Sequence, residues 1–407
     1  MDVMLGLSRK VQGIEESQTL ALTAKAMRLK ESGKDIVSLT AGEPDFPTPA
    51  HVKDAAVRAI KKDFTHYTPN RGIGDLVDAV ILKFARDNGL HFTPEQILVC
   101  SGAKHAIFNV LQAICDSGDE VVILSPYWVS YPEMVKLVGA VPVIVPPGTG
   151  FRPDPEAIRK AIGPKTKALI LNTPNNPAGT VFTAEEIAAI AALAAERAIY
   201  VVSDEVYERV IFDGRTHTGI GAVPGIADRV ITVNGVSKAY AMTGWRIGFV
   251  GGPADVVGAA ARVQSQTTSC ASSISQKASV AALSGSEKEI RAMVAEFQTR
   301  RDQVDAALRE IPGVSVVRPE GAMFFFFNVG SFLGRSAHGR TMRSSADIAH
   351  HLLDHHMVAL VPGSSFGDDS CLRLSFSSPP GLLDEGVKRI RRGLNELRDC
   401  DRDTTNR

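Results

Sequence analysis

The sequence predicts an α/β protein whose helices cover both faces of a mostly parallel β-sheet, followed by a smaller α+β region. Two observations support this prediction. Between about residues 51 and 251, short apolar runs of strand length alternate with amphipathic helical segments, a pattern typical of parallel strands joined by helices. After residue 255 this alternation stops, and the last hundred residues combine strands and helices in a different order.

The elements are expected in the following order. A polar helix at residues 17–32 and a strand at 36–39 precede a turn at 41–47, where Gly and Pro interrupt both helix and strand. Seven strands follow, at residues 96–100, 120–124, 141–145, 166–172, 198–203, 229–234 and 247–251. Helices precede and separate them, at residues 51–62, 74–88, 102–115, 131–138, 154–161 and 183–197.

The last part of the chain has a different character. It is helical from residue 255 to about residue 308, and strands are then expected at residues 314–317, 323–328, 358–361 and 372–376. A chain of 407 residues is also too long for one ordinary core. We therefore expect a large domain at residues 51–295 and a small domain formed by residues 1–50 and 296–407.

Charge and cysteine content limit the classes of function. Lys and Arg together number 45, as do Asp and Glu, so no net field favours nucleic acid or an anionic membrane. The five cysteines are scattered without a Cys-x-x-Cys pair, which argues against disulfides and a structural zinc site. No apolar run suits a signal peptide or a membrane span. We expect a cytoplasmic protein that binds small molecules.

The segment NGVSKAYAMTGWRIG, residues 234–248, carries the strongest chemical signal. Lys238 follows an expected strand within a loop of small residues, and Arg246 enters the next strand eight residues later. A nucleophilic lysine needs a partly desolvated site to be neutral near pH 7, and an arginine beside it suits bidentate phosphate binding. Taken alone, such a lysine is more simply a surface residue.

Two further strand ends carry polar side chains. Asp204 and Tyr207 lie in YVVSDEVY, at the carboxyl end of an apolar strand, where open α/β sheets bind ligands. Asp204 suits a protonated pyridine nitrogen, although an aspartate in this position is also a common helix N-cap. In NTPNNPAG, two Pro and one Gly form a rigid turn that holds Asn176 as a hydrogen-bond donor.

Three weaker signals complete the set. In SGAKHA a strand leads into a helix through Gly102 and Ala103, so free N–H groups can bind phosphate and Lys104 can add charge. Trp128 follows the next strand and can stack on a planar ring or pack in the core. Arg373 lies inside an apolar strand and needs a carboxylate partner, either structural or from a substrate.

These motifs occur together in one chain and in a characteristic order. AGEPDF, SPYW, NTPNNPAG, SDEVY, SKAYAMTGWRIG, VPGSSFG and RLSF resemble the class I aminotransferases of the aspartate aminotransferase family, over about residues 7–397. The resemblance implies the pyridoxal-phosphate-dependent transferase fold type I, with a seven-stranded sheet and a small domain built from both termini. It also implies a homodimer with shared active sites, which transfers an amino group from an L-amino acid to a 2-oxo acid by a ping-pong mechanism.

The resemblance assigns roles to individual residues. Lys238 would carry pyridoxal 5'-phosphate as a Schiff base and move the substrate proton, with Asp204 and Tyr207 as further catalytic residues. The cofactor-binding residues would be Gly102, Ala103, Lys104, Trp128, Asn176, Asp204, Tyr207, Ser237, Lys238, Arg246 and, in the site of the partner subunit, Tyr67. Arg373 would bind the substrate α-carboxylate, next to the Gly42 backbone, Trp128 and Asn176.

Three positions differ from relatives that use acidic substrates. Gly235 stands three residues before Lys238, where many members have a phosphate-binding serine, and Ser237 is a candidate replacement. Glu15 stands where a basic residue is expected. Gln112 lies on a helix where a lysine binds the distal carboxylate in some relatives. An acidic, aromatic, neutral or basic donor therefore stays open.

Other functions stay open as well. A lyase or decarboxylase on the same scaffold would use the same lysine, aspartate and arginine. An effector sensor would need an output module, for which we expect no room before the first motif. A nicotinamide dehydrogenase is disfavoured because no Gly-x-Gly-x-x-Gly opens a helix after a strand. His351 and His355 have i,i+4 metal spacing, but without an obvious third, acidic ligand we expect no metal site.

Overall fold

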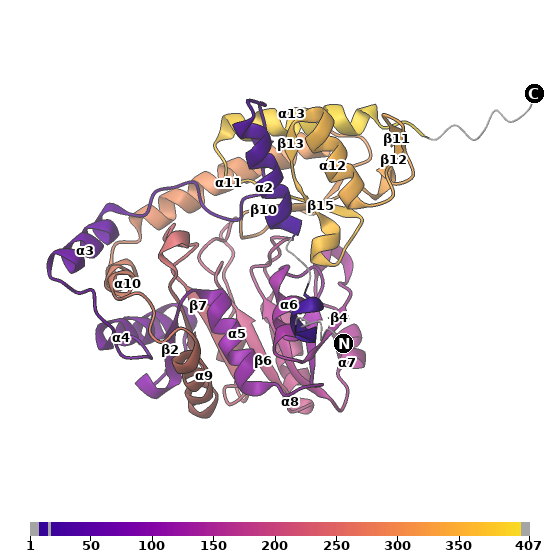
Figure 1. Ribbon diagram of the computed structural model, residues 1–407. Helices are drawn as coiled ribbons and strands as arrows, with labels where there is room; N and C mark the ends of the chain where they lie inside the picture. Colours follow the sequence, from indigo (N-terminus) through magenta and orange to yellow (C-terminus); the bar gives the residue numbers. More distant parts are fainter. Residues whose placement is uncertain (1–7, 15–17, 400–407) are drawn as a thin grey trace, which may run out of the picture.

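The computed structural model describes residues 8–14 and 18–399 and has two lobes (Figure 1). The larger lobe contains a seven-stranded sheet in the order β2-β8-β7-β6-β5-β3-β4. Its strands are β2 (Ile97–Cys100), β3 (Glu120–Leu124), β4 (Val141–Val145), β5 (Thr166–Asn172), β6 (Tyr200–Asp204), β7 (Val230–Gly235) and β8 (Gly248–Gly251). Neighbouring strands are parallel, except that β8 runs antiparallel to β2 and β7. The expected α/β fold class is confirmed.

Alternating residues of the central strands face two different cores. In β3, Val121 and Ile123 pack with helices α5 (Ala103–Ile114), α6 (Ser130–Leu137) and α9 (Ala254–Thr267). Val122 lies between them in sequence and packs on the other face, with α7 (Pro155–Ala161) and α8 (Ala184–Glu196). Because both faces of the sheet are covered, most positions of the central strands are apolar, although the buried Ser203 and Thr232 interrupt these runs.

Three more helices cover the end of the sheet near β2 and β8. They are α3 (Ala50–Lys61), α4 (Gly74–Lys83) and α10 (Ser273–Ser284), which share a third core. The helix expected at residues 74–88 is shorter: α4 ends at Lys83, a π-helical turn covers Phe84–Asn88, and Gly89 stops it with a left-handed φ of 65°. Glycine takes this conformation without steric cost, so the chain can leave the helix there.

The smaller lobe contains segments from both the N-terminal and the C-terminal parts of the chain. Strand β1 (Val37–Ser38) pairs with β13 (Val358–Ala359), and a second sheet has the order β14-β15-β10-β9. The strands of that sheet are β9 (Ser315–Val316), β10 (Phe324–Asn328), β14 (Val361–Pro362) and β15 (Cys371–Ser375). Helices α1 (Arg9–Gln12), α2 (Gln18–Glu31), α11 (Lys288–Arg309), α12 (Ser345–His356) and α13 (Pro380–Glu396) complete the described N- and C-terminal parts.

Two details differ from expectation in this part of the chain. The single strand expected at 358–361 is two strands, because β13 and β14 belong to different sheets and Leu360 lies between them. A short hairpin of β11 (Ser336–Ala337) and β12 (Arg340–Thr341) was not expected. The domain boundary proposed at residue 295 falls within the continuous helix α11, and the three domain ranges stay predictions. Among the described residues, no helix is long and apolar enough to cross a membrane.

Candidate active site

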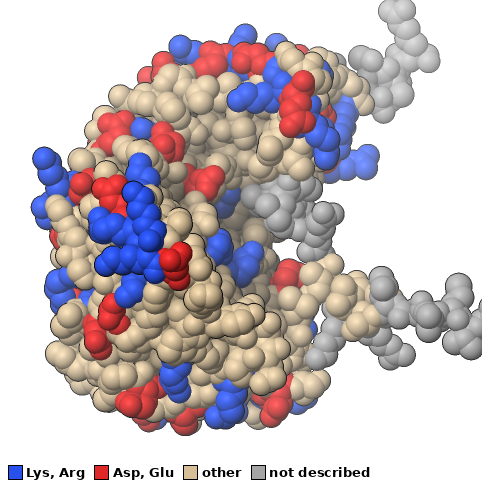
Figure 2. Space-filling view, turned by 60° about the vertical axis from the view of Figure 1, so that its left-hand side comes forward, with Lys and Arg blue, Asp and Glu red and all other residues tan. Residues whose placement is uncertain are grey.

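A cavity of about 290 Å³ is lined by residues of both lobes. Figure 2 shows the molecule hollowed between the lobes, with basic side chains visible inside the hollow. Asn172 and Asp204 line the cavity from the ends of β5 and β6, and Lys238 from the loop after β7. Gly42 and Arg373 line it from the smaller lobe. The cavity therefore lies at the carboxyl ends of parallel strands, where such sheets bind ligands.

Lys238 is half-buried and lines this cavity. Its Nζ donates a hydrogen bond to the Gly42 carbonyl oxygen at 2.5 Å and lies 5.7 Å from the centre of the Tyr207 ring. Burial lowers the pKa of Lys238 to about 8, and the positive charges of Arg373 and Arg246 act in the same direction. A substantial fraction of the amine is thus neutral near pH 8, as a nucleophile or a general base requires.

Asp204 ends strand β6 and is 4% exposed. Its Oδ2 accepts a hydrogen bond from the Tyr131 hydroxyl at 2.6 Å, and its Oδ1 accepts one from the Val206 N–H at 3.3 Å. Burial raises the pKa of Asp204 to about 6, although both hydrogen bonds lower it. A turn follows the strand rather than a helix, so Asp204 is not an N-cap, and its carboxylate is available to a cation in the cavity.

Arg373 lies in β15 and is 3% exposed. Its guanidinium donates to the Thr40 carbonyl oxygen at 2.9 Å and to Asn176 Oδ1 at 3.1 Å. It lies 4.5 Å from the centre of the Phe324 ring and 4.8 Å from that of Phe366. Burial lowers its pKa to about 10, so it stays charged at neutral pH. Among the described residues its Nε has no hydrogen-bond partner, and an unpaired buried cation is costly unless a ligand compensates it.

The start of α5 approaches Arg246 very closely. Gly102 has φ +94°, and a Cβ atom there would collide with the Arg246 guanidinium. A Cβ atom on Gly248 would collide with the backbone of Gly102 and Ala103. The first N–H groups of a helix have no acceptor within the helix. Because Gly102 and Gly248 have no side chains, the Arg246 guanidinium can lie beside the first N–H groups of α5. Together these donors suit the binding of a phosphate group.

Aromatic and amide side chains complete the wall of the cavity. Trp128 and Lys104 both line it, with Lys104 Nζ 4.9 Å from the centre of the tryptophan ring. Burial and the nearby Arg246 lower the pKa of Lys104. Burial raises the pKa of Tyr207, which keeps its hydroxyl protonated as a donor. The Asn176 N–H donates to Asn172 Oδ1 at 2.9 Å, which anchors the rigid turn.

The structure brings nearly all of the expected site residues together. The expected residues that line the cavity are Gly42, Ala103, Lys104, Trp128, Asn176, Asp204, Tyr207, Ser237, Lys238, Arg246 and Arg373. Gly102 lies directly before α5, in contact with Arg246. Tyr67 does not line the cavity and is 92% exposed. Their catalytic and binding roles stay predictions.

The three positions considered for substrate preference have different outcomes. Gln112 is exposed near the end of α5 and does not line the cavity. Glu15 lies outside the described residues. At Gly235 an added Cβ would lie 2.9 Å from the Ile247 carbonyl oxygen, so tight packing against β8 explains the missing serine.

Sequence reasoning missed several residues that line the cavity. They are Val129, Ser130, Tyr131, Asn172, Val206 and Thr243. Tyr131 is the most informative of them, because its hydroxyl binds Asp204 directly. It lies in a helical pattern in which a buried aromatic side chain is ordinary core, and only the fold places its hydroxyl opposite the strand end.

Comparison with known proteins gives a consistent result. A family model described as aminotransferase class I and II matches residues 34–390. The chain is 45% identical to the aspartate/prephenate aminotransferase of Thermus thermophilus, over 96% of this chain and 99% of that protein. It is 41% identical to the aspartate aminotransferase of Bacillus subtilis, over 95% of this chain and 98% of that protein.

Solved structures agree with this result. The aspartate aminotransferase of Rhizobium meliloti has a TM-score of 0.93 at 39% identity, covering 97% of this chain and 100% of that one. The aspartate aminotransferase of Thermus thermophilus with maleate has a TM-score of 0.89 at 44% identity, covering 96% of this chain and 100% of that one.

Proposed function

The chain belongs to the family of class I and II aminotransferases and is an aminotransferase, and from this premise we propose that its amino donor is an acidic L-amino acid such as aspartate. The acceptor is a 2-oxo acid. One observation carries the proposal: besides the nucleophile Lys238, three cationic side chains line the cavity. They are Lys104, Arg246 and Arg373. Among the described residues that line it, Asp204 is the one carboxylate. A phosphorylated cofactor and a substrate with two carboxylates would balance this charge.

Proteins of this family use pyridoxal phosphate, and the residues present fit that group. Arg246 and the N-terminus of α5 would hold its phosphate, in the space kept free by Gly102. Asp204 would hold the pyridine nitrogen, and Trp128 would face the ring. Asn176 and Tyr207 would bind the ring oxygen. When bound there, the cofactor supplies an electron sink for the carbanion formed at the substrate Cα.

The protein side chains carry the remaining steps. Arg373 binds the α-carboxylate through paired N–H groups, with its plane held between Phe324 and Phe366. This orients the Cα–H bond toward Lys238, whose neutral amine accepts the proton and later returns it. Because the pKa of Lys238 is about 8, the amine can both take and release a proton near neutral pH.

Lys104 is the candidate for the second carboxylate of the donor. It lines the same cavity as Arg373 and lies against Trp128. The relatives named above act on aspartate or prephenate by name, and one solved relative carries the dicarboxylate maleate. These names support an acidic substrate. This role for Lys104 differs from the phosphate contact expected from the sequence, and the two roles predict different kinetics.

We also propose a homodimer in which Tyr67 reaches the partner subunit's cofactor. Tyr67 is the most exposed of the large hydrophobic side chains in the described chain, at 92%. It borders a shallow surface hollow together with Thr68, Asn70, Ser265, Ser269 and Cys270. An aromatic side chain with so little cover in one subunit is explained if a second subunit buries it. Sedimentation of the purified chain tests the dimer.

The donor is tested with Lys104→Met and the surface control Lys160→Met. Wild type should have a higher kcat/KM for aspartate than for alanine or phenylalanine. Lys104→Met should lower kcat/KM for aspartate by about 10- to 100-fold, the loss of one charged hydrogen bond, and leave alanine unchanged. An equal loss for all donors would instead assign Lys104 to the phosphate. A wild type that prefers alanine or phenylalanine would contradict the acidic donor.

A further inference from the structure

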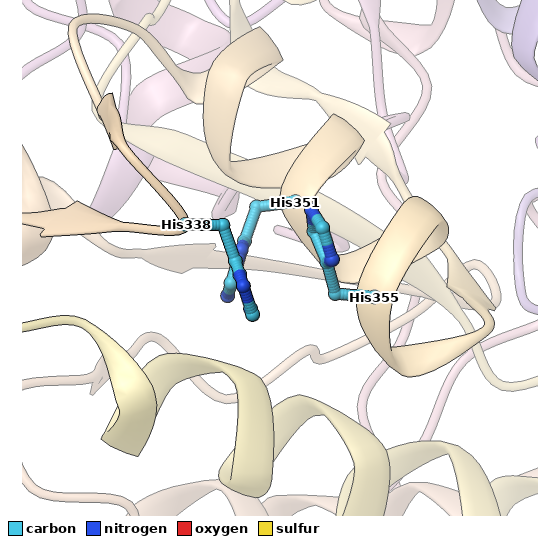
Figure 3. Close-up of side chains that lie close together, drawn as sticks. All are labelled: His338, His351 and His355. Carbon is cyan, nitrogen blue, oxygen red and sulfur yellow. The ribbon is translucent and has the colours of Figure 1, made fainter.

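Three histidines converge on the outer side of the smaller lobe, away from the cavity. His351 and His355 lie one turn apart on α12, and His338 comes from the turn between β11 and β12 (Figure 3). One ligand atom from each side chain can be chosen so that all three lie within 4.8 Å of one another. None of the three lines the catalytic cavity. The sequence shows only the α12 pair, because the hairpin that supplies the third ring is folded against the helix.

The three imidazole rings lie close together. The rings of His338 and His355 are stacked, with centroids 3.9 Å apart and an angle of 10°. The His351 ring lies 5.5 Å from that of His355 and 5.8 Å from that of His338. Because the lone pair of a ring nitrogen lies in the plane of its ring, the stacked His338 and His355 rings must turn to share one ion.

Two of the rings already have the outer partners typical of metal-bound histidines. The His351 Nε2–H donates to the Gly393 carbonyl oxygen at 3.1 Å, and His338 Nε2 lies 3.0 Å from Glu396 Oε1. A backbone carbonyl or a carboxylate on one ring nitrogen fixes the tautomer and leaves the other nitrogen as a metal ligand. Glu396 also bonds His356, at 2.6 Å, so the end of α13 is held against the end of α12.

We propose that His338, His351 and His355 form a binding site for one divalent transition-metal ion such as Zn²⁺, with Glu396 as the carboxylate that orients His338. Tetrahedral zinc–nitrogen bonds of about 2.1 Å place ligand atoms about 3.4 Å apart, so the side chains must rotate to bring atoms that now lie within 4.8 Å of one another onto one ion. Water can fill the fourth position, because His338 and His355 are exposed. The bound ion would join the β11–β12 hairpin to α12.

The test uses the full-length chain without a polyhistidine tag, stripped of metal with EDTA and titrated with ZnCl₂ in a calorimeter. We expect one ion per chain in wild type. The double variant His338→Ala/His355→Ala, which changes two exposed side chains, should bind at least about tenfold more weakly. His350→Ala is the matched control, because His350 lies on the same helix outside the cluster, and its affinity should equal that of wild type.

Absence of binding in wild type, or equal affinity in the double variant, overturns the proposal. A second measurement guards against misfolding of the variants. Zinc K-edge X-ray absorption of wild type with one equivalent of Zn²⁺ should show imidazole scattering from three histidines. A first shell containing sulfur, which would place the ion on a cysteine such as Cys270, would also overturn it.

Discussion

Replacing Arg373 with lysine should lower kcat/KM about equally for every amino-acid donor. The guanidinium is held flat by Phe324 and Phe366 at 4.5 and 4.8 Å and oriented by Thr40 and Asn176. Lysine keeps the charge but loses the paired N–H groups and the stacking. One charged hydrogen bond and one cation–π contact together are worth about 2–4 kcal/mol, which corresponds to a fall of about 30- to 1000-fold.

The assay is kcat/KM for aspartate, alanine and phenylalanine with a fixed 2-oxo acid. Because all donors share the α-carboxylate, the factor should be similar for each. Arg389→Lys is the control: Arg389 is another buried arginine of the smaller lobe, bonded to Asp35 and to the Met357 carbonyl oxygen, and it does not line the cavity. A loss confined to one donor, or none at all in a folded protein, would remove Arg373 from α-carboxylate binding.

Three further predictions concern the cofactor side of the cavity. Since the pKa of Lys238 is lowered to about 8, covalent attachment of pyridoxal phosphate to the cofactor-free chain should accelerate up to about pH 8 and then level off; stopped-flow rates that still climb tenfold between pH 9 and 10 would contradict this. The pKa of Asp204 is raised from 3.8 to about 6 in the folded chain. Ionisation of this buried carboxyl therefore lowers the free energy of unfolding as pH rises from about 4 to 6. Asp204→Asn should therefore gain about 1.5 kcal/mol more stability in the cofactor-free chain at pH 8 than at pH 5, and equal urea-unfolding gains at the two pH values would refute it. Gly102→Ala should weaken binding of pyridoxal phosphate at least about tenfold, because the new methyl group displaces Arg246; equilibrium dialysis that finds unchanged affinity would show that the phosphate lies elsewhere.

Local patterns predict the strands of the larger lobe closely, because most of these strands are short, largely apolar runs, including the partly exposed edge strand β4. The expected ranges 120–124, 141–145 and 166–172 coincide with β3, β4 and β5. The smaller lobe was harder to predict. Leu360 is as buried as its neighbours, so nothing in the sequence marks the point at which β13 ends and β14 joins another sheet.

The residues of the site likewise divide into those that local sequence patterns identify and those that only the fold brings together. Lys238, Asp204 and Arg246 occupy positions next to strand ends that sequence alone identifies. Tyr131 and His338 depend on packing between distant segments: one meets Asp204 across 73 residues, and the other meets α12 through a short hairpin. Such pairs have no periodicity for a sequence pattern to detect.

The most direct test of the proposed function is a single turnover. The chain loaded with pyridoxal phosphate is mixed with aspartate and no 2-oxo acid, and the absorbance spectrum and products are followed together. We expect the visible absorption of the covalently bound cofactor to disappear, with one equivalent of oxaloacetate formed per chain, no ammonia released, and the spectrum restored by 2-oxoglutarate. Release of ammonia or carbon dioxide, or a chain that fails to retain pyridoxal phosphate, would contradict the proposed reaction.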